Sequence, residues 1–466
     1  MGSIGRLLLL AAVICALILA AVGLHRAMRK PGLKPEEAAR LARLDGVWRS
    51  RGYGWLWAIK AGRLDVYDES GSYCIARPDI RIKLDDLDQG FDLSADGQRL
   101  SLPLEDPTYR FAFDRIEALP EACAGTPDAT PPAVIDALGH IFSAHYAFFE
   151  VRHVDWPALL AAAARKVHRD TSEEELLAVV KDLLSKIDDD HVGLHARIKG
   201  RWVECNAGGG EALKEVAEEA CRQDVELNDM VERWKQRVWA LEIEDELFSE
   251  TLMTKANGNV KYGLIDNDIG FLAILAMGDF GRGDDGVALD KALDKAMERF
   301  KDARAVIVDV TVNEGGEDIL ARKIAARFAA KRTLVYSKFA GDAPGAAPQA
   351  IYLDPARGPR YLGPVYLLTS NVTLSAAEIF TLAMRALPNV THMGERTRGS
   401  LSDELVKRLP NGWRLTLSNE VYLDADGKGW EGSGIPPAVL VPVFPQGADP
   451  AASHAAAVRA VVKRIR

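Results

Sequence analysis

The stretch that decides the fold is a strand-to-helix turn near the C-terminal end, Asn371-Val372-Thr373-Leu374-Ser375-Ala376-Ala377-Glu378-Ile379-Phe380. It follows an apolar, strand-like segment, Val365 to Leu368, and precedes a helical pattern from Ala376 to Leu387. A serine at the tip of such a turn exposes its hydroxyl next to helical N–H groups that have no intrahelical partner. Ser375 is therefore a candidate nucleophile, and the alternative is a plain helix N-cap.

The residues around this turn alternate between apolar runs and helical periodicity. The expected strands are Gly270 to Leu275, Ala305 to Val310 and Val365 to Thr369, and the expected helices between them are Leu289 to Phe300 and Ile319 to Ala330. This alternation predicts a sheet covered by helices. We expect an α/β core over residues 256–446 and a C-terminal tail or helix over residues 447–466.

The N-terminal half has a different pattern. Short alternating runs and turn residues between Gly46 and Ile116 predict a small β-rich domain within residues 31–130. Its tryptophans favour core packing over a binding face. Helical periodicity then predicts a helical segment over residues 131–200 and a charged helical linker over residues 201–255. The fold class expected is α+β or α/β and multidomain.

Length and charge restrict the function. A chain of 466 residues is larger than one hydrophobic core usually holds, so two to four domains are expected. The net charge of −9 gives no indication of nucleic-acid binding.

Residues 1–30 contain an unbroken apolar run from Leu7 to Leu24, preceded by Arg6 and followed by a basic cluster. The run is close to the roughly 18 residues that suggest a membrane span. A retained anchor is favoured over a cleaved signal peptide, and the flanking charges do not fix the orientation.

The cysteines favour an oxidising compartment. Besides Cys15 in the apolar run, the body holds Cys74, Cys123, Cys205 and Cys221. An even number in two groupings suggests disulfides 74–123 and 205–221, although three connectivities and four free thiols are the alternatives. We therefore expect the body to lie outside the cytoplasm, periplasmic or secreted, with residues 7–24 in the membrane.

Three further segments carry motif-like patterns. They are Asp309-Val310-Thr311-Val312-Asn313-Glu314-Gly315-Gly316, Gly394-Glu395-Arg396-Thr397-Arg398-Gly399-Ser400 and Trp430-Glu431-Gly432-Ser433-Gly434-Ile435-Pro436-Pro437. The first is a strand that enters a Gly-Gly turn, where backbone N–H groups can converge on an oxyanion.

Together with the Ser375 turn, and in this order, these motifs resemble the core shared by the C-terminal processing (tail-specific) peptidases and the tricorn protease. The resemblance covers roughly residues 133–443, without most of the linker over residues 200–255. It implies a crotonase-like ββα sheet-and-helix core that acts on peptide or unfolded protein substrates, with Ser375 as the nucleophile and without a cofactor or metal.

The chain departs from the family pattern at several positions. Thr311 stands where the family has arginine, Glu314 where it has glycine and Pro437 where it has aspartate, and no PDZ module is evident. Ser400 occupies the place of the catalytic lysine of the processing peptidases. In the tricorn-like branch a histidine is the base and a late glutamate orients it.

The resemblance to that branch assigns His191 as the base and Glu431 as its partner, as in a serine–histidine–carboxylate triad. The acyl oxygen would lie against the N–H groups of Gly315 and Ala376. Alternatives are a metal site over Asp188 to His195, a structural His191, a solvated Glu431, and Lys407 in place of the missing lysine. The alternative function is a non-catalytic peptide- or lipid-binding protein that retains the fold.

Overall fold

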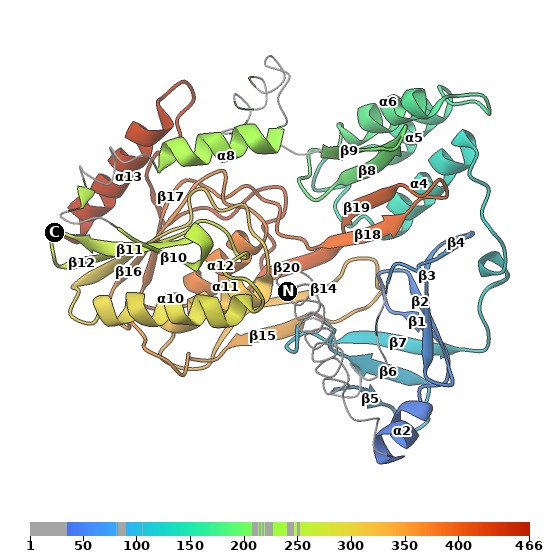
Figure 1. Ribbon diagram of the computed structural model, residues 1–466, viewed down its shortest axis with the longest axis horizontal. Coiled ribbons are helices and arrows are strands. Elements are labelled where there is room, and N and C mark those ends of the chain that lie inside the picture. Colours follow the sequence, from blue (N-terminus) through green and yellow to red (C-terminus); the bar gives the residue numbers. More distant parts are fainter. Residues whose placement is uncertain are drawn as a thin grey trace, which may run out of the picture.

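The computed structural model describes residues 35–80, 82, 90–104, 106–206, 213, 216, 219, 227–239, 247–248 and 252–466. Residues 1–34, which include the expected anchor, lie outside this part of the chain. No helix in the described ranges is long and apolar enough to cross a membrane. The expectation of a mixed α/β, multidomain chain is confirmed (Figure 1).

The N-terminal domain is one antiparallel sheet. Its strands in spatial order are β4 (Tyr73–Ala76), β3 (Arg63–Ser70), β2 (Trp55–Lys60), β1 (Gly46–Ser50), β7 (Phe111–Ile116), β6 (Arg99–Leu102) and β5 (Asp92–Leu93). Helix α2 (Pro35–Ala42) precedes it, and the short helix η1 (Glu121–Cys123) follows it. Trp48 and Trp57 are buried in the core, as expected. A disulfide joins Cys74 to Cys123, whereas Cys221 lies outside the described residues.

The next layer combines helices from one part of the chain with strands from two. The helices are α4 (Pro131–His145), α5 (Trp156–Ala164) and α6 (Glu173–Leu184). They share a core with a four-stranded sheet of β18 (Glu404–Arg408), β19 (Arg414–Ser418), β8 (Gly193–Ile198) and β9 (Arg201–Asn206). Because β8 pairs with β19, the segment that carries His191 is joined to the C-terminal region.

The α/β core is built on a second seven-stranded sheet. Its order is β10 (Met253–Lys255), β11 (Val260–Ile265), β12 (Ile269–Ile274), β13 (Ala305–Asp309), β16 (Val365–Thr369), β17 (Val390–Gly394) and β21 (Val439–Leu440). The strands from β12 to β21 are parallel. A three-stranded sheet of β15 (Gln349–Leu353), β14 (Thr333–Ala340) and β20 (Glu420–Asp424) runs from this core towards the other layers (Figure 1).

Helices cover both faces of the core sheet. One face packs against α10 (Asp285–Arg299), α11 (Asp318–Ala325) and α12 (Ala376–Arg385), and the other against α8 (Leu227–Val238) and α13 (Pro450–Ile465). The short helices η2 (Ala256–Gly258) and η3 (Ala326–Phe328) complete the core. On β13, Val306 and Val308 face the first set and Ile307 faces the second, as the two-residue period of a strand requires.

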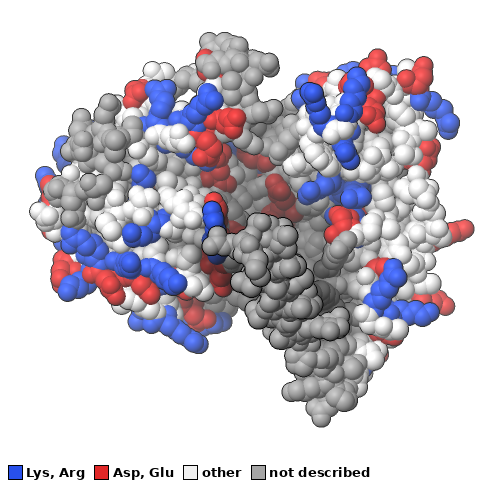
Figure 2. All heavy atoms as spheres, viewed as in Figure 1, with Lys and Arg blue, Asp and Glu red and all other residues white. Residues whose placement is uncertain are grey.

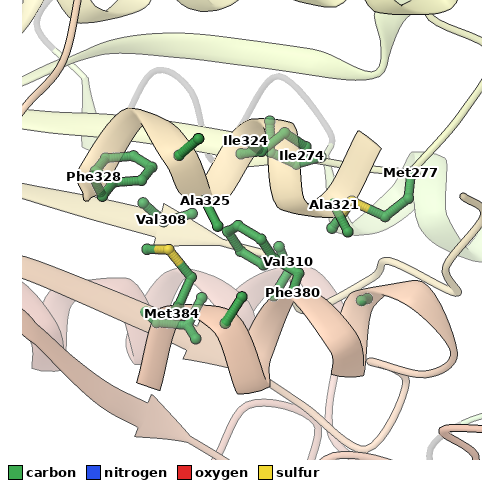
Figure 3. Packing of buried hydrophobic residues seen from close by; sticks show 14 of the residues in the cluster. Ile274, Met277, Val308, Val310, Ala321, Ile324, Ala325, Phe328, Phe380 and Met384 are labelled. Carbon is green, nitrogen blue, oxygen red and sulfur yellow. The ribbon is translucent and has the colours of Figure 1, made fainter. Parts of the chain in front are cut away.

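Helix α12 is buried along nearly its whole length. Phe380 and Met384 point from α12 towards α11 and pack in one cluster with Val308 and Val310 (Figure 3). Because a close-packed interior leaves little room for movement, this packing fixes the position of the helix N-terminus. The residue held at that terminus is Ser375.

Candidate active site

Ser375 has the geometry of an activated side chain. It immediately precedes α12 with φ 56° and ψ −131°, a backbone conformation that is uncommon for a residue other than glycine. Its side chain makes no capping hydrogen bond to α12, all of whose residues the structure describes. Instead, Ser375 Oγ lies 3.0 Å from His191 Nε2. The structure therefore brings the expected nucleophile and base into hydrogen-bond contact.

His191 is held in the loop between α6 and β8 by its backbone. Its N–H donates to Asp189 Oδ1 at 3.0 Å. Asp189 is fully buried and also accepts hydrogen bonds from the hydroxyls of Tyr146 and Ser418. The imidazole is buried too, and within the described chain its Nδ1 has no hydrogen-bond partner. The loop is thus anchored by a carboxylate, whereas the ring is oriented only at Nε2.

Glu431 lies in a neighbouring network without a hydrogen bond to His191. Its Oε1 accepts from Arg152 at 2.7 Å, and its Oε2 accepts from the N–H groups of Leu401 at 2.8 Å and Ser402 at 3.0 Å. Burial and the nearby Asp189 raise the pKa of Glu431 to about 8, opposed by Arg152. The three expected triad residues are therefore not joined in one direct relay.

Arg152 is the site residue that sequence reasoning missed. It follows α4 in an unremarkable loop, yet its guanidinium contacts Glu431, the carbonyl oxygens of Asp188 and Gly399, and, at 3.7 Å, Asp189. It connects the His191 loop to the segment beside Ser375. No local pattern marks this arginine, because its partners lie far along the chain.

Ser400 occupies the position where the family resemblance would place a lysine. It is fully buried, and its Oγ donates to Asp190 Oδ2 at 2.7 Å. Its carbonyl oxygen accepts the N–H of Ser375 at 2.9 Å. Arg398 forms ion pairs with both Asp188 and Asp190. The carboxylates that precede His191 in the sequence are thus already paired with arginine side chains and hydroxyl groups.

Glu378, in the first turn of α12, shapes the loop next to the nucleophile. It accepts hydrogen bonds from the Thr397 hydroxyl at 2.5 Å and from the N–H groups of Gly399 at 2.9 Å and Ser400 at 2.8 Å. Burial raises its pKa to about 7, opposed by these donors. The carboxyl group fixes the loop whose carbonyl holds Ser375.

Gly315 and Ala376 lie beside Ser375. A Cβ added at Gly315, whose φ is 100°, would be 2.6 Å from Ser375 Cβ and 2.9 Å from the Ala376 nitrogen, so only glycine fits. Ala376 is the first residue of α12, where an N–H has no intrahelical acceptor. The N–H of Gly315, however, donates to Asn313 Oδ1 at 2.8 Å.

Two alternatives from the sequence find no support in the geometry. Lys407 is fully buried, and its Nζ donates to the carbonyls of Tyr53 and Gly54 and to Asp68 in the N-terminal domain. Within the described ranges, no group of three or more His, Cys, Asp or Glu side chains could hold a metal ion.

Comparisons with known proteins identify a family and a shared fold. Residues 268–441 match the family described as Peptidase family S41. A candidate peptidase from Parabacteroides merdae is 25% identical, over 72% of this chain and 97% of that one, with a TM-score of 0.57. Mature CPAF complexed with lactacystin is 11% identical, over 72% and 98% of the two chains, with a TM-score of 0.52, and shares the fold.

The family match contains Ser375, the Gly315 turn and Glu431, and the sheet that holds them is shared with the solved structures. Residues 268–441 therefore form a domain of the kind found in peptidase family S41, and the chain is a serine-type hydrolase.

Proposed function

We propose that this chain hydrolyses peptide bonds through an acyl-enzyme on Ser375, with His191 as the base, in the manner of the tricorn-like branch. The observation that carries the proposal is the 3.0 Å contact between Ser375 Oγ and His191 Nε2. Ser400 and the distant Lys407 support a histidine base over a lysine base.

In the first half-reaction, Ser375 Oγ attacks the scissile carbonyl carbon while its proton moves to His191 Nε2. The carbonyl oxygen becomes an oxyanion, which the Ala376 N–H stabilises. The Gly315 N–H joins it if the Asn313 amide releases this donor. His191 then protonates the leaving amine, and the C–N bond breaks to leave the acyl-enzyme.

In the second half-reaction, a water molecule gives a proton to His191 and attacks the acyl carbon. Collapse of this intermediate breaks the ester bond and returns the proton from His191 to Ser375 Oγ. The products are the two peptide fragments, and the enzyme regains its starting state.

We assign Glu431 a positioning role. It contacts Arg152, Arg152 contacts Asp189, and Asp189 accepts the backbone N–H of His191. Through this chain of contacts, Glu431 would fix the His191 loop instead of binding the imidazole directly.

We further propose that the body acts outside the cytoplasm, anchored by residues 7–24. The Cys74–Cys123 disulfide supports this location, because disulfides persist in oxidising compartments.

The second candidate function is a non-catalytic peptide- or lipid-binding protein. Two observations favour it: the Gly315 N–H is occupied by Asn313, and His191 Nδ1 has no acceptor in the described chain. A fluorophosphonate probe tests the two functions, because only an activated serine reacts with it. Labelling at Ser375, absent in Ser375→Ala, would support the peptidase; an unlabelled folded protein would support the binding function.

A further inference from the structure

A pocket lies where the N-terminal sheet meets the segments beside the active site. Its volume is about 60 Å³. Three aromatic residues of the N-terminal domain form one wall, and residues 403–405, 419 and 420 form the other. About 10–15 Å³ suffices for one water molecule, so the pocket has room for roughly four, or for the end of a long side chain.

The aromatic wall is a single packed unit. The ring centroids of Tyr53 and Trp55 are 4.8 Å apart in a stacked arrangement, and Phe111 lies 5.0 Å and 5.4 Å from them. Such rings present the negative face of their π-systems to a cation. The N-terminal domain thereby contributes a rigid apolar surface to this pocket.

Negative charge exceeds positive charge around the pocket. Lys338 on β14 faces Glu420, Asp318 and Asp403, while Arg322 faces Asp318 and pairs with Asp106. Two cations thus face four carboxylates. Glu420 is satisfied by Lys338 at 2.8 Å and by the hydroxyls of Tyr53 and Tyr422.

Asp403 and Asp318 are the two of these carboxylates without a cation in hydrogen-bond contact among the described residues. Asp318 accepts the Tyr422 hydroxyl at 2.9 Å, whereas Asp403 lines the pocket. Its Oδ1 accepts only the N–H of its neighbour Glu404, at 2.7 Å. Its side chain stays accessible although protein surrounds it. The protein packed around this carboxyl group and the nearby Glu420 raise the pKa of Asp403 to about 7, opposed by Lys338. A cation in the pocket would balance this charge.

Asn419 supplies an independent indication of a ligand. Asn419 is fully buried and is one of the residues that line the pocket. Its Nδ2 donates to the His145 carbonyl at 3.1 Å, but its Oδ1 has no hydrogen-bond partner in the described chain. An unpaired buried acceptor is costly, so a donor entering the pocket would satisfy it.

The pocket is close to the proposed nucleophile. Asp403 follows Ser400, whose carbonyl accepts the Ser375 N–H, by three residues, a span of at most about 11 Å along the chain. Asp318 follows Gly315 by the same number of residues. Acidic side chains gather in the hollow between the two lobes on this face (Figure 2).

We propose that this pocket binds a lysine or arginine side chain of the peptide substrate, within about three residues of the bond that Ser375 attacks. The cationic group would donate to Asp403 and to Asn419 Oδ1, and its methylene stem would pack on the aromatic wall. This inference rests on the proposed peptidase function and gives that function a substrate preference.

The test is a cleavage profile of the purified chain on a peptide library prepared with a protease that spares lysine and arginine. Three proteins are compared: wild type, Asp403→Asn, and Asp426→Asn, which removes the same charge from an exposed turn. We expect at least fivefold enrichment of basic residues at one position near the cleaved bond in wild type and Asp426→Asn, and its loss in Asp403→Asn.

Matched peptides with lysine or norleucine at that position give the size of the effect. The lysine-to-norleucine ratio of kcat/KM should exceed ten in wild type, rise as the pH increases through about 7, and fall to about one in Asp403→Asn. Asp403→Lys should reverse the preference towards glutamate. A ratio near one in wild type, or one retained in Asp403→Asn, would overturn the inference. Fluorophosphonate labelling of Ser375 in the same samples shows separately whether the peptidase proposal holds.

Discussion

Two hydrogen-bonded serine–histidine pairs occur among the described residues, and the one with the more complete side-chain relay lies outside the proposed active site. Ser70 Oγ lies 2.8 Å from His145 Nε2, and His145 Nδ1 lies 2.5 Å from Asp342 Oδ2. This set has the order of a Ser–His–Asp triad. The Ser375–His191 pair has no such carboxylate on Nδ1 in the described chain.

The surroundings of the two serines differ more than their side-chain partners do. Ser70 ends strand β3, is 2% exposed, and pairs with Tyr73 of β4. Ser375 is half-buried, has a positive φ, and precedes the free N–H of a helix and a glycine turn. Burial excludes a substrate from Ser70 and suits a structural contact, whereas the accessible Ser375 next to a helix N-terminus suits the proposed acyl transfer.

The first prediction separates the two serines by activity. Ser375→Ala should lower kcat by about 10⁴-fold or more, because it removes the nucleophile. Ser70→Ala should leave kcat unchanged and reduce the free energy of unfolding by about 0.5–1.5 kcal/mol, because it removes one hydrogen bond of His145 Nε2 and leaves the contact with the Glu69 carbonyl. Peptide hydrolysis and urea denaturation of both variants measure this. Full activity in Ser375→Ala together with loss in Ser70→Ala would reverse our assignment.

The second prediction concerns the buried lysine that could have served as an alternative base. Lys407→Met leaves the buried Asp68 with Arg77 as its remaining charged partner, so it should destabilise the protein by about 3–5 kcal/mol. The folded fraction should still react with fluorophosphonate at Ser375, whereas His191→Ala should not. A stable Lys407→Met variant that fails to label would restore a serine–lysine mechanism.

The sequence predicted the parts of the site that depend on local patterns. The apolar run before Ser375 and the periodicity after it correctly placed a strand and a helix, and the cysteine spacing correctly suggested the 74–123 pair. The alternation of strands and helices predicted the α/β core. The spacing of apolar residues along the chain reveals it, because this spacing follows which face of each helix or strand is buried.

Other features depend on contacts that no local pattern encodes. The pairing of β8 with β19 joins residues more than two hundred positions apart, and Arg152 acquires its role from partners at residues 399 and 431. The sequence correctly indicated the turn at Gly315. It did not indicate that the Asn313 side chain adopts the rotamer that accepts the Gly315 N–H. Tertiary packing decides such details.

The third prediction uses the pH dependence of stability around Ser375. The pKa of Glu378 is about 7 in the fold, above its ordinary value of 4.5, so the folded state binds the proton more tightly than the unfolded state. This stabilisation, about 3 kcal/mol, is fully present below pH 4.5 and is lost as the pH rises through 7. Glu378→Gln should flatten this slope in urea denaturation between pH 4.5 and 7. An unchanged slope would mean that Glu378 titrates normally.

The last and smallest effect tests whether Glu431 serves the site through the loop or through the imidazole. In Glu431→Gln, one carboxamide must face both Arg152 and two N–H donors, so a mismatched contact is inevitable and the His191 loop loosens. A loosening of about 1.4–2.8 kcal/mol in the transition state corresponds to a loss of about ten- to a hundredfold in kcat/KM. Because the effect passes through Arg152, the conservative variant Arg152→Lys should cost a similar factor, and the double variant should cost little more than either single one. Asp426→Asn serves as the surface control. A loss in Glu431→Gln as large as that in His191→Ala, with Arg152→Lys fully active, would instead show that Glu431 acts on the imidazole directly, and the Ser375 site would then have the same three-part relay as the buried Ser70 set.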